Sequence, residues 1–76
     1  MKYTIEIEKW ADEWFTVHLI KRANLQLVKA VANIDGVEHC EMFGAYSLAI
    51  KKAKLFEWKD VEIELLNVLR EESYLD

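Results

Sequence analysis

The fold of this chain is decided by residues 33–52, NIDGVEHCEMFGAYSLAIKK, where two alternating runs flank a glycine turn. Residues 37–43 predict a strand whose side chains alternate between a buried face and an outer face. Its inward positions hold Cys40 and Met42, and its outward positions hold His39 and Glu41. Residues 43–45 form the turn or bulge. A second strand follows at residues 46–51, with Tyr46, Leu48 and Ile50 inward and Ser47, Ala49 and Lys51 outward.

Helices are predicted on both sides of this stretch. Asn24 begins the first, because its side chain can accept a hydrogen bond from a free N–H group of the first turn. This helix runs to Ile34, and Gly36 supplies the left-handed residue that often follows a helix. Its apolar stripe comprises Leu25, Val28, Val31 and Ala32, with Leu27 and Ile34 at the margin. The second helix covers residues 57–72, and its stripe comprises Trp58, Val61, Leu65, Val68 and Leu69.

The N-terminal part of the chain predicts a β-hairpin. Residues 3–7 alternate between apolar and polar side chains, which indicates a strand. A second strand is expected at residues 14–20, and residues 11–13 are short enough to connect the two. Its inward side chains are Phe15, Val17 and Leu19, and its outward ones are Thr16 and His18.

The predicted order of elements is ββαββα, which defines an α+β fold class. A two-layer arrangement buries every apolar face: a four-stranded, mainly antiparallel sheet with both helices on one of its faces. The chain has 76 residues, so we expect a single domain over residues 1–76. Hydrophobic residues make up 53% of the sequence, which is enough to form a folded core.

Charge and cysteine content restrict the class of protein further. The net charge of -4 disfavours nucleic acid as a partner, because phosphate contacts need a basic surface. The single cysteine, Cys40, excludes an internal disulfide and favours a reducing, cytoplasmic setting. We expect no membrane association, since no apolar run is long enough to cross a bilayer.

Residues 33–52, together with the Trp58 that follows, resemble the N-terminal domain of Nfu/NifU-type iron–sulfur scaffold proteins. The resemblance rests on the step Ile34-Asp35-Gly36-Val37 after a helix, on Phe43-Gly44 after a strand, and on a strand that ends in lysine. A tryptophan then opens the final helix. With the two earlier strands, the similarity covers nearly the whole chain and implies the same fold.

The chain differs from this family in its first turn and in the cysteine motif on which the family's chemistry depends. The family's turn between the first two strands is rich in Pro and Asn, and here it is replaced by Trp10-Ala11-Asp12-Glu13. The cluster chemistry of those scaffolds belongs to a separate domain with a Cys-x-x-Cys motif, whereas this sequence has Cys40 alone. The resemblance therefore transfers no functional residue, and no cofactor is predicted.

Three side chains could in principle carry chemistry: Cys40, His18 and His39. His39 neighbours Cys40 but points to the opposite face, so we expect a core cysteine rather than an activated thiol. The two histidines share the outer face with acidic side chains, and a metal site is the alternative to solvated side chains. This outer face is predicted to be polar, which disfavours stacking of nucleic-acid bases. Its residues are Thr4, Glu6, Glu8, Thr16, His18, Ser47 and Ala49.

Apolar side chains outside the predicted core indicate a contact surface. Ile63 and Leu66 lie off the stripe of the second helix, and Ile63 is almost opposite it. Trp10 and Trp14 form a second candidate patch around the first loop, since tryptophan is favoured at the centre of interfaces. We therefore expect a protein partner, or self-association as a homodimer, at these four residues.

Three functions follow from these observations. The first is a small non-enzymatic interaction or adaptor domain of unknown role, with self-association as one form of it. The second is an accessory protein in iron–sulfur cluster assembly, which rests on the resemblance alone. The third is a small metal-dependent enzyme, which would need a pocket that contains His18 or His39 together with a carboxylate. No catalytic residue is assigned.

Overall fold

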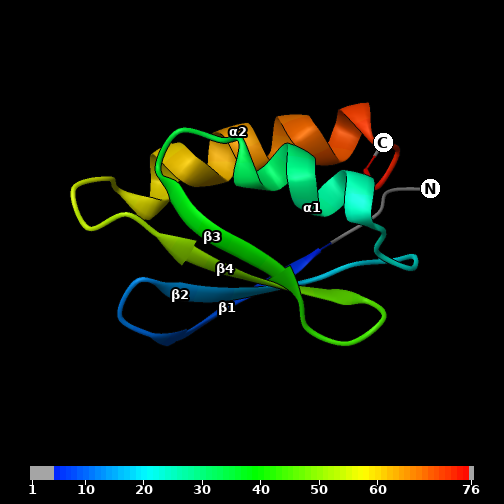
Figure 1. Ribbon diagram of the computed structural model, residues 1–76, viewed down its shortest axis with the longest axis horizontal. Coiled ribbons are helices and arrows are strands. Elements are labelled where there is room, and N and C mark those ends of the chain that lie inside the picture. Colours follow the sequence, from blue (N-terminus) through cyan, green and yellow to red (C-terminus); the bar gives the residue numbers. More distant parts are fainter. Residues whose placement is uncertain (1–4, 76) are drawn as a thin grey trace.

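The computed structural model describes residues 5–75, and its elements follow one another in the predicted order ββαββα (Figure 1). The predicted α+β class is therefore confirmed. The strands are β1 (Glu6–Ala11), β2 (Trp14–His18), β3 (Val37–Met42) and β4 (Ser47–Lys52), and the helices are α1 (Leu25–Ala32) and α2 (Trp58–Glu71). Neither helix combines the length and the apolar character that a membrane crossing requires.

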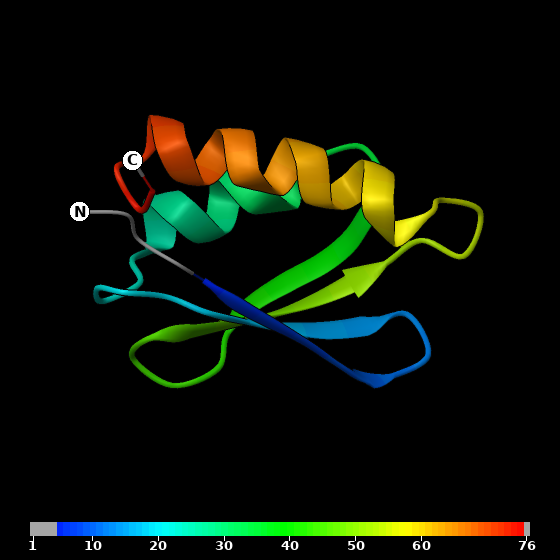
Figure 2. The same cartoon turned by 180° about the vertical axis from the view of Figure 1, so that it is seen from behind.

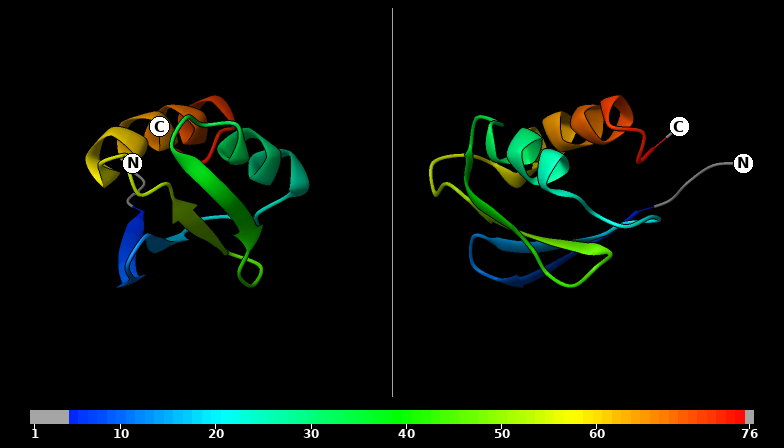
Figure 3. Two further views of the ribbon diagram at one scale, coloured as in Figure 1. Left: turned by 60° about the vertical axis from the view of Figure 1, so that its left-hand side comes forward. Right: turned by 45° about the vertical axis from the view of Figure 1, so that its right-hand side comes forward.

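The strands form one antiparallel sheet with the order β1-β2-β4-β3. Because β4 pairs with both β2 and β3, these two strands run in the same direction, and α1 makes the crossover between them. Both helices lie over one side of the sheet, and no helix in the described part of the chain covers the other side (Figures 2 and 3). We call the helix-covered side the inner face and the other side the open face.

The core lies between the inner face and the two helices. Cys40 belongs to this cluster, so its predicted core position is confirmed. The buried stripe predicted for the second helix is confirmed at Val61, Leu65 and Leu69. Residues with almost no exposed surface are Val17, Leu27, Val31, Leu48, Ile50, Val61, Leu65, Leu69 and Tyr74.

The first helix begins as predicted, but its buried stripe is rotated. Oδ1 of Asn24 accepts a hydrogen bond from the backbone N–H of Leu27 at 2.8 Å, which caps α1. Leu27 and Val31 are buried and Ile34 follows them into the core, whereas Leu25 is exposed. Placing Leu27 and Ile34 at the margin of the stripe was therefore wrong. Their spacings of four and three residues around Val31 keep all three side chains on one face.

The turn after α1 begins earlier than predicted and depends on Gly36. The helix ends at Ala32, and Gly36 has a φ of +94° in the turn that leads into β3. The carbonyl of Ile34 accepts a hydrogen bond from the N–H of Val37 at 3.1 Å. A Cβ at Gly36 would lie 2.6 Å from the ring of Phe56, so this position needs glycine for its backbone and for the close approach.

The first hairpin lies further along the chain than predicted. β1 covers Glu6–Ala11 instead of residues 3–7, and Tyr3 and Thr4 lie outside the described residues. The strands are joined by a two-residue turn, Asp12-Glu13. Its second residue, Glu13, has a φ of 68°, a left-handed backbone conformation that residues other than Gly, Asn and Asp seldom adopt.

Met42 and Tyr46, which were predicted to point into the core, are exposed. β4 begins at Ser47, so Tyr46 lies in the loop before the strand. The loop between β3 and β4 projects away from both helices (Figure 3). These apolar side chains at the end of the hairpin therefore lie beyond the helical layer that would cover them.

A C-terminal turn that the sequence did not reveal closes α2. The N–H of Tyr74 donates to the carbonyl of Leu69 at 2.6 Å, and the N–H of Ser73 donates to that of Arg70 at 3.1 Å. With a φ of 66° at Ser73, this is a Schellman motif. It turns Tyr74 into the core, where the hydroxyl donates to the carbonyl of Arg22 at 3.0 Å and burial raises the pKa of the phenol.

Candidate functional site

Strand register sets a transverse row of side chains on the open face. Glu8 of β1 pairs with Thr16 of β2. Ala49 of β4 pairs with Thr16 on one side and with Glu41 of β3 on the other. The row therefore has a carboxylate at each end and small side chains in the middle. Thr16 and Ala49 are only 7% and 3% exposed although no described helix covers them, so other open-face side chains must do so.

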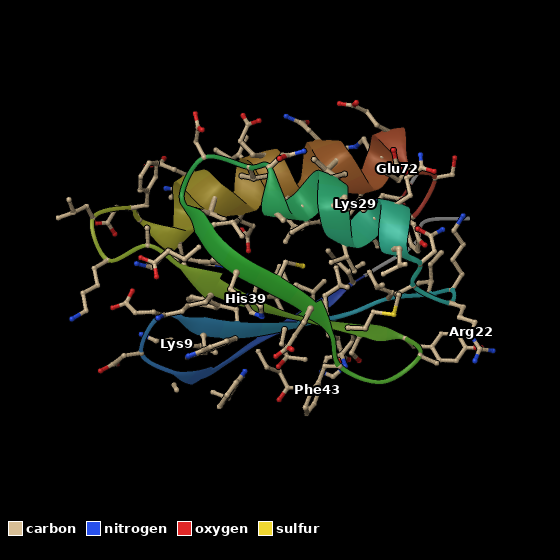
Figure 4. All side chains as sticks on the ribbon, viewed as in Figure 1. Lys9, Arg22, Lys29, His39, Phe43 and Glu72 are labelled. Atoms are coloured by element: carbon tan, nitrogen blue, oxygen red, sulfur yellow. The ribbon has the colours of Figure 1, made fainter. Side chains whose placement is uncertain are left out.

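A cavity of about 420 Å³ lies above Thr16, between two aromatic side chains. The aromatic walls are Trp10 and Phe43, which are 59% and 63% exposed. Figure 4 shows Phe43 on the side of the sheet away from the helices. We call this cavity the open-face groove. The residues that line it are Glu8, Trp10, Thr16, His18 and Phe43.

A β-bulge places Trp10 at this groove. Lys9 and Ala11 pair with consecutive residues of β2, so Trp10 between them is an extra residue in β1. Its ring centroid lies 5.6 Å from that of Trp14, with the planes tilted by 35°. The ring of Trp14 in turn meets that of His39 edge-on, with a centroid distance of 6.1 Å. Packing against this aromatic row orients the Trp10 wall.

A chain of hydrogen bonds forms the polar side of the groove. Nε2 of His18 lies 2.7 Å from Oε1 of Glu8, and Nδ1 of His18 lies 3.1 Å from Oγ of Ser47. In the neutral imidazole, Nε2–H donates to the carboxylate and Nδ1 accepts from the serine hydroxyl. The chain fixes the carboxylate of Glu8 beside the aromatic walls.

Glu8, His18 and Ser47 also form the carboxylate–imidazole–hydroxyl sequence of a catalytic triad. Acyl transfer further needs donors aimed at the developing oxyanion. Ser47 begins β4, which lies between β2 and β3, so the backbone N–H groups of this strand are used by the two ladders. The site therefore contains a potential base but lacks a preorganised oxyanion hole on β4.

Each histidine lies near one carboxylate, but a metal site needs more ligands than one such pair. Nε2 of His39 lies 3.7 Å from Oε2 of Glu41, and His18 contacts Glu8 as described. Among residues 5–75, no group of three or more His, Cys, Asp or Glu side chains is arranged to hold a metal ion. Because zinc sites in proteins use at least three side-chain ligands, these pairs alone do not define one.

Cys40 lies on the inner face, away from the groove. Burial raises the pKa of its thiol to about 12, and the nearby charge of Glu41 adds to the effect. The thiolate is the form that attacks substrates and binds metals. At neutral pH Cys40 is therefore a protonated core side chain.

Two hydrogen bonds anchor the turn beside the bulge to β4. The carbonyl of Glu13 accepts from the backbone N–H of Lys52 at 2.6 Å, and Nζ of Lys52 donates to Oε2 of Glu13 at 2.7 Å. The hydrogen bond from Lys52 holds the pKa of the Glu13 carboxyl below its ordinary value. This contact attaches the hairpin that carries Trp10 to an interior strand.

A second cavity, of about 550 Å³, lies between α1 and α2 and includes Ile63. Ile63 is 54% exposed. Leu66, the other helix residue predicted for an interaction surface, is half-buried and packs against the core. The structure thus separates the two: Ile63 borders a cavity and Leu66 supports the core. We call this cavity the α1–α2 groove; its lining is Ala30, Asn33, Ile34, Asp35, Phe56, Asp60, Ile63, Glu64 and Val68.

The predicted polar character of the open face needs correction. Glu8, Thr16 and His18 lie there as expected, but Trp10, Trp14 and Phe43 lie there too. Phe43 was assigned to a turn and Trp10 to a candidate patch around the first loop, so neither was predicted to lie on the open face. The continued alternation from Glu8 to Trp10 was the signal that could have found the groove's first wall.

Comparisons of the chain with protein-family models, with curated proteins and with solved structures find no match. The resemblance to the Nfu/NifU-type N-terminal domain stays a prediction from the sequence motifs. The open-face groove offers the strongest basis for a functional argument, because it combines exposed aromatic walls with a fixed carboxylate.

Proposed function

We propose that this chain is a non-enzymatic binding module that holds a segment of a partner protein in the open-face groove. One observation carries the proposal: Trp10 and Phe43 are more than half exposed and bound a concave site above the small side chain of Thr16. Aromatic residues supply much of the energy of protein interfaces. A bound segment would remove this apolar surface from water, which favours association.

The construction of the groove also favours binding over catalysis. Its titratable side chains, Glu8 and His18, hydrogen-bond to each other, and His18 bonds further to Ser47. Such a network holds side chains in place, as a recognition site requires. Trp10 stands on β1, and Phe43 directly follows β3, where its N–H donates to the carbonyl of Ser47 at 2.8 Å. Both walls are therefore attached to a sheet whose other face is packed.

A peptide array tests the proposed function. The labelled protein is applied to short peptides of varied sequence, and the double variant Trp10→Ala/Phe43→Ala is applied to an identical array. We expect the unmodified protein to retain peptides that the double variant loses, because both walls are removed while the inner face is unchanged. Circular dichroism and urea unfolding establish that the double variant is folded.

Leu55→Ala is the matched control, because Leu55 is also an exposed apolar side chain but does not line the groove. It should retain the same peptides as the unmodified protein. The proposal is wrong if the double variant keeps those peptides, or if the unmodified protein retains none of them.

Ester hydrolysis tests the non-enzymatic part of the proposal. The turnover of p-nitrophenyl acetate is compared between the unmodified protein, His18→Gln and Ser47→Ala. We expect equal rates, because the strand that carries Ser47 offers no preorganised oxyanion hole. A rate for the unmodified protein about tenfold or more above both variants would instead assign a general base to His18.

A further inference from the structure

We infer that the partner segment is basic and places one arginine side chain in the open-face groove and a second one beside Glu41. This inference rests on the proposed function and adds the chemistry of the partner to it. Three observations support it. They are the charge of the open face, the hydrogen bonding of the two oxygens of Glu8, and the distance between the two carboxylates of the transverse row.

Among residues 5–75, the open face carries more acidic than basic side chains. Glu6, Glu8 and Glu41 lie on it, and Lys51 is the opposing charge. Nζ of Lys51 lies 3.4 Å from Oε1 of Glu38, which offsets part of that positive charge. The faces of the aromatic walls are also the negative part of the ring quadrupole. Both features attract cations and disfavour phosphates and acidic peptides.

Glu8 is placed to bind a guanidinium group. Its Oε1 is held by His18, whereas its Oε2 has no hydrogen-bond partner within residues 5–75. A guanidinium group is planar, so it can stack on an aromatic ring and donate to a carboxylate at the same time. Trp10 and Phe43 supply aromatic rings in the same groove as that carboxylate. An ammonium group lacks the flat surface, so arginine matches the groove better than lysine.

The two ends of the transverse row set the spacing of the basic residues. Glu8 and Glu41 stand on the two edge strands, three strand spacings apart, which is about 14 Å. An extended peptide across the strands advances about 3.3 Å per residue, so side chains four residues apart are about 13 Å apart and point the same way. Between these two carboxylates lie Thr16 and Ala49, and the peptide backbone would cross the side chains that cover them. The geometry favours the pattern Arg-x-x-x-Arg.

Two other occupants match the face less well. A face-to-face homodimer would bring two copies of this acidic face together, with Lys51 as the opposing charge among the described residues. A nucleic acid could stack its bases on the aromatic walls, but its phosphates would approach the same carboxylates. The charge of the open face therefore favours a basic polypeptide.

Titration with the acetylated and amidated peptide SRSTSRS tests the inference. Tryptophan fluorescence measures the Kd, and NMR shift changes locate the site. We expect the changes at Thr16 and at the Trp10 indole. Replacing both arginines with citrulline keeps their shape and removes their charge, and should raise the Kd about tenfold or more. Moving the arginines to a three-residue spacing should raise it about threefold, because the second side chain then points away.

Charge variants of the protein complete the experiment. Glu8→Gln and Glu41→Gln should each raise the Kd about fivefold, because each removes one charge-assisted hydrogen bond. Glu64→Gln is the matched control, since Glu64 is an exposed carboxylate in the α1–α2 groove. This control should leave the Kd unchanged.

The outcomes separate this inference from the proposed function. Equal binding of the arginine and citrulline peptides, or no binding of either at millimolar concentration, overturns the inference while leaving the array result standing. Shift changes confined to Ile63 and Glu64 overturn it as well, because the peptide then occupies the α1–α2 groove. A dimer in sedimentation velocity that Trp10→Ala dissociates would assign the open-face groove to a second copy of this chain and would also overturn the inference.

Discussion

The open-face groove and the α1–α2 groove differ in whether the residues that line them also pack in the core. Ile34 and Val68 line the α1–α2 groove and are also part of the core or packed against it. Trp10 and Phe43 line the open-face groove and contribute nothing to the buried core cluster. Either aromatic wall of the open-face groove can therefore be changed with little effect on the core, whereas binding and stability are coupled in the α1–α2 groove.

Charge alone does not distinguish the two surfaces. The α1–α2 groove is lined by Asp35, Asp60 and Glu64, so it is also acidic. The open-face groove differs by its two exposed aromatic walls and by a carboxylate that is hydrogen-bonded to a histidine. Fixed geometry, more than net charge, is what marks it as a specific site.

The largest expected effect compares the core with the open face. Leu65 of α2 is fully buried, so Leu65→Ala should lower the free energy of unfolding by about 3 kcal/mol, through lost burial and a residual cavity. Trp10→Ala removes a larger side chain that is mostly exposed and should cost less than about 1 kcal/mol. Urea unfolding at neutral pH measures both. Equal losses would show that Trp10 is part of the stabilising core, and the separation of binding from stability would fail.

The two glycines provide a second comparison, because one lies beside each groove. Gly36 and Gly44 both have positive φ, but a Cβ at Gly36 would lie 2.6 Å from Phe56 and 2.9 Å from Val61, whereas a Cβ at Gly44 meets nothing. We expect Gly36→Ala to cost about 2–3 kcal/mol and Gly44→Ala about 1 kcal/mol, the left-handed penalty alone. Thermal unfolding of the two variants under identical conditions measures the difference. If Gly44→Ala were the more destabilising, the loop beside Phe43 would be more tightly constrained than the structure indicates.

The sequence predicted the fold because local signals agreed with one another. The alternation in residues 46–51, the cap at Asn24 and the stripe on α2 each indicated one element, and only one layered arrangement buries all of them. The errors occurred where tertiary packing decides whether a side chain is buried. Tyr74 is drawn into the core by a turn whose left-handed residue is Ser73, and serine is not the residue that usually marks such a turn.

The site could not be predicted to the same extent, because it depends on strand register. Trp10 reaches the groove through a bulge, and Phe43 joins it across two intervening strands. Alternation from Glu8 could have indicated the face of Trp10, but neither the bulge nor the approach of Phe43 is encoded in a local pattern. The sequence did group Trp10 with Trp14 in one patch, and their ring centroids lie 5.6 Å apart, but it did not place Phe43 on the same face.

A smaller difference is expected between the two apolar residues that the sequence placed together on α2. Leu66 packs against the core and Ile63 does not, so Leu66→Ala should cost about 1 kcal/mol while Ile63→Ala should stay within about 0.5 kcal/mol. Chemical unfolding resolves this difference when the curves are fitted with one shared slope of unfolding free energy against denaturant concentration. A larger loss for Ile63→Ala would mean that the α1–α2 groove is a structural contact and not a free surface.

The smallest effect concerns acid and the hairpin that carries Trp10. Because the pKa of Glu13 is lowered in the folded chain, its ion pair with Lys52 stabilises the protein above the ordinary pKa near 4.5, and this contribution is lost as the pH falls below that value. Glu13→Gln removes the contribution at neutral pH but has none to lose in acid. The unmodified protein should therefore lose more Tm between pH 7 and pH 3 than Glu13→Gln does, whereas the control Glu64→Gln should follow the unmodified protein. Parallel curves for the unmodified protein and Glu13→Gln would show that the backbone hydrogen bond from Lys52 alone anchors the turn, and that the open face keeps its aromatic wall without the charge.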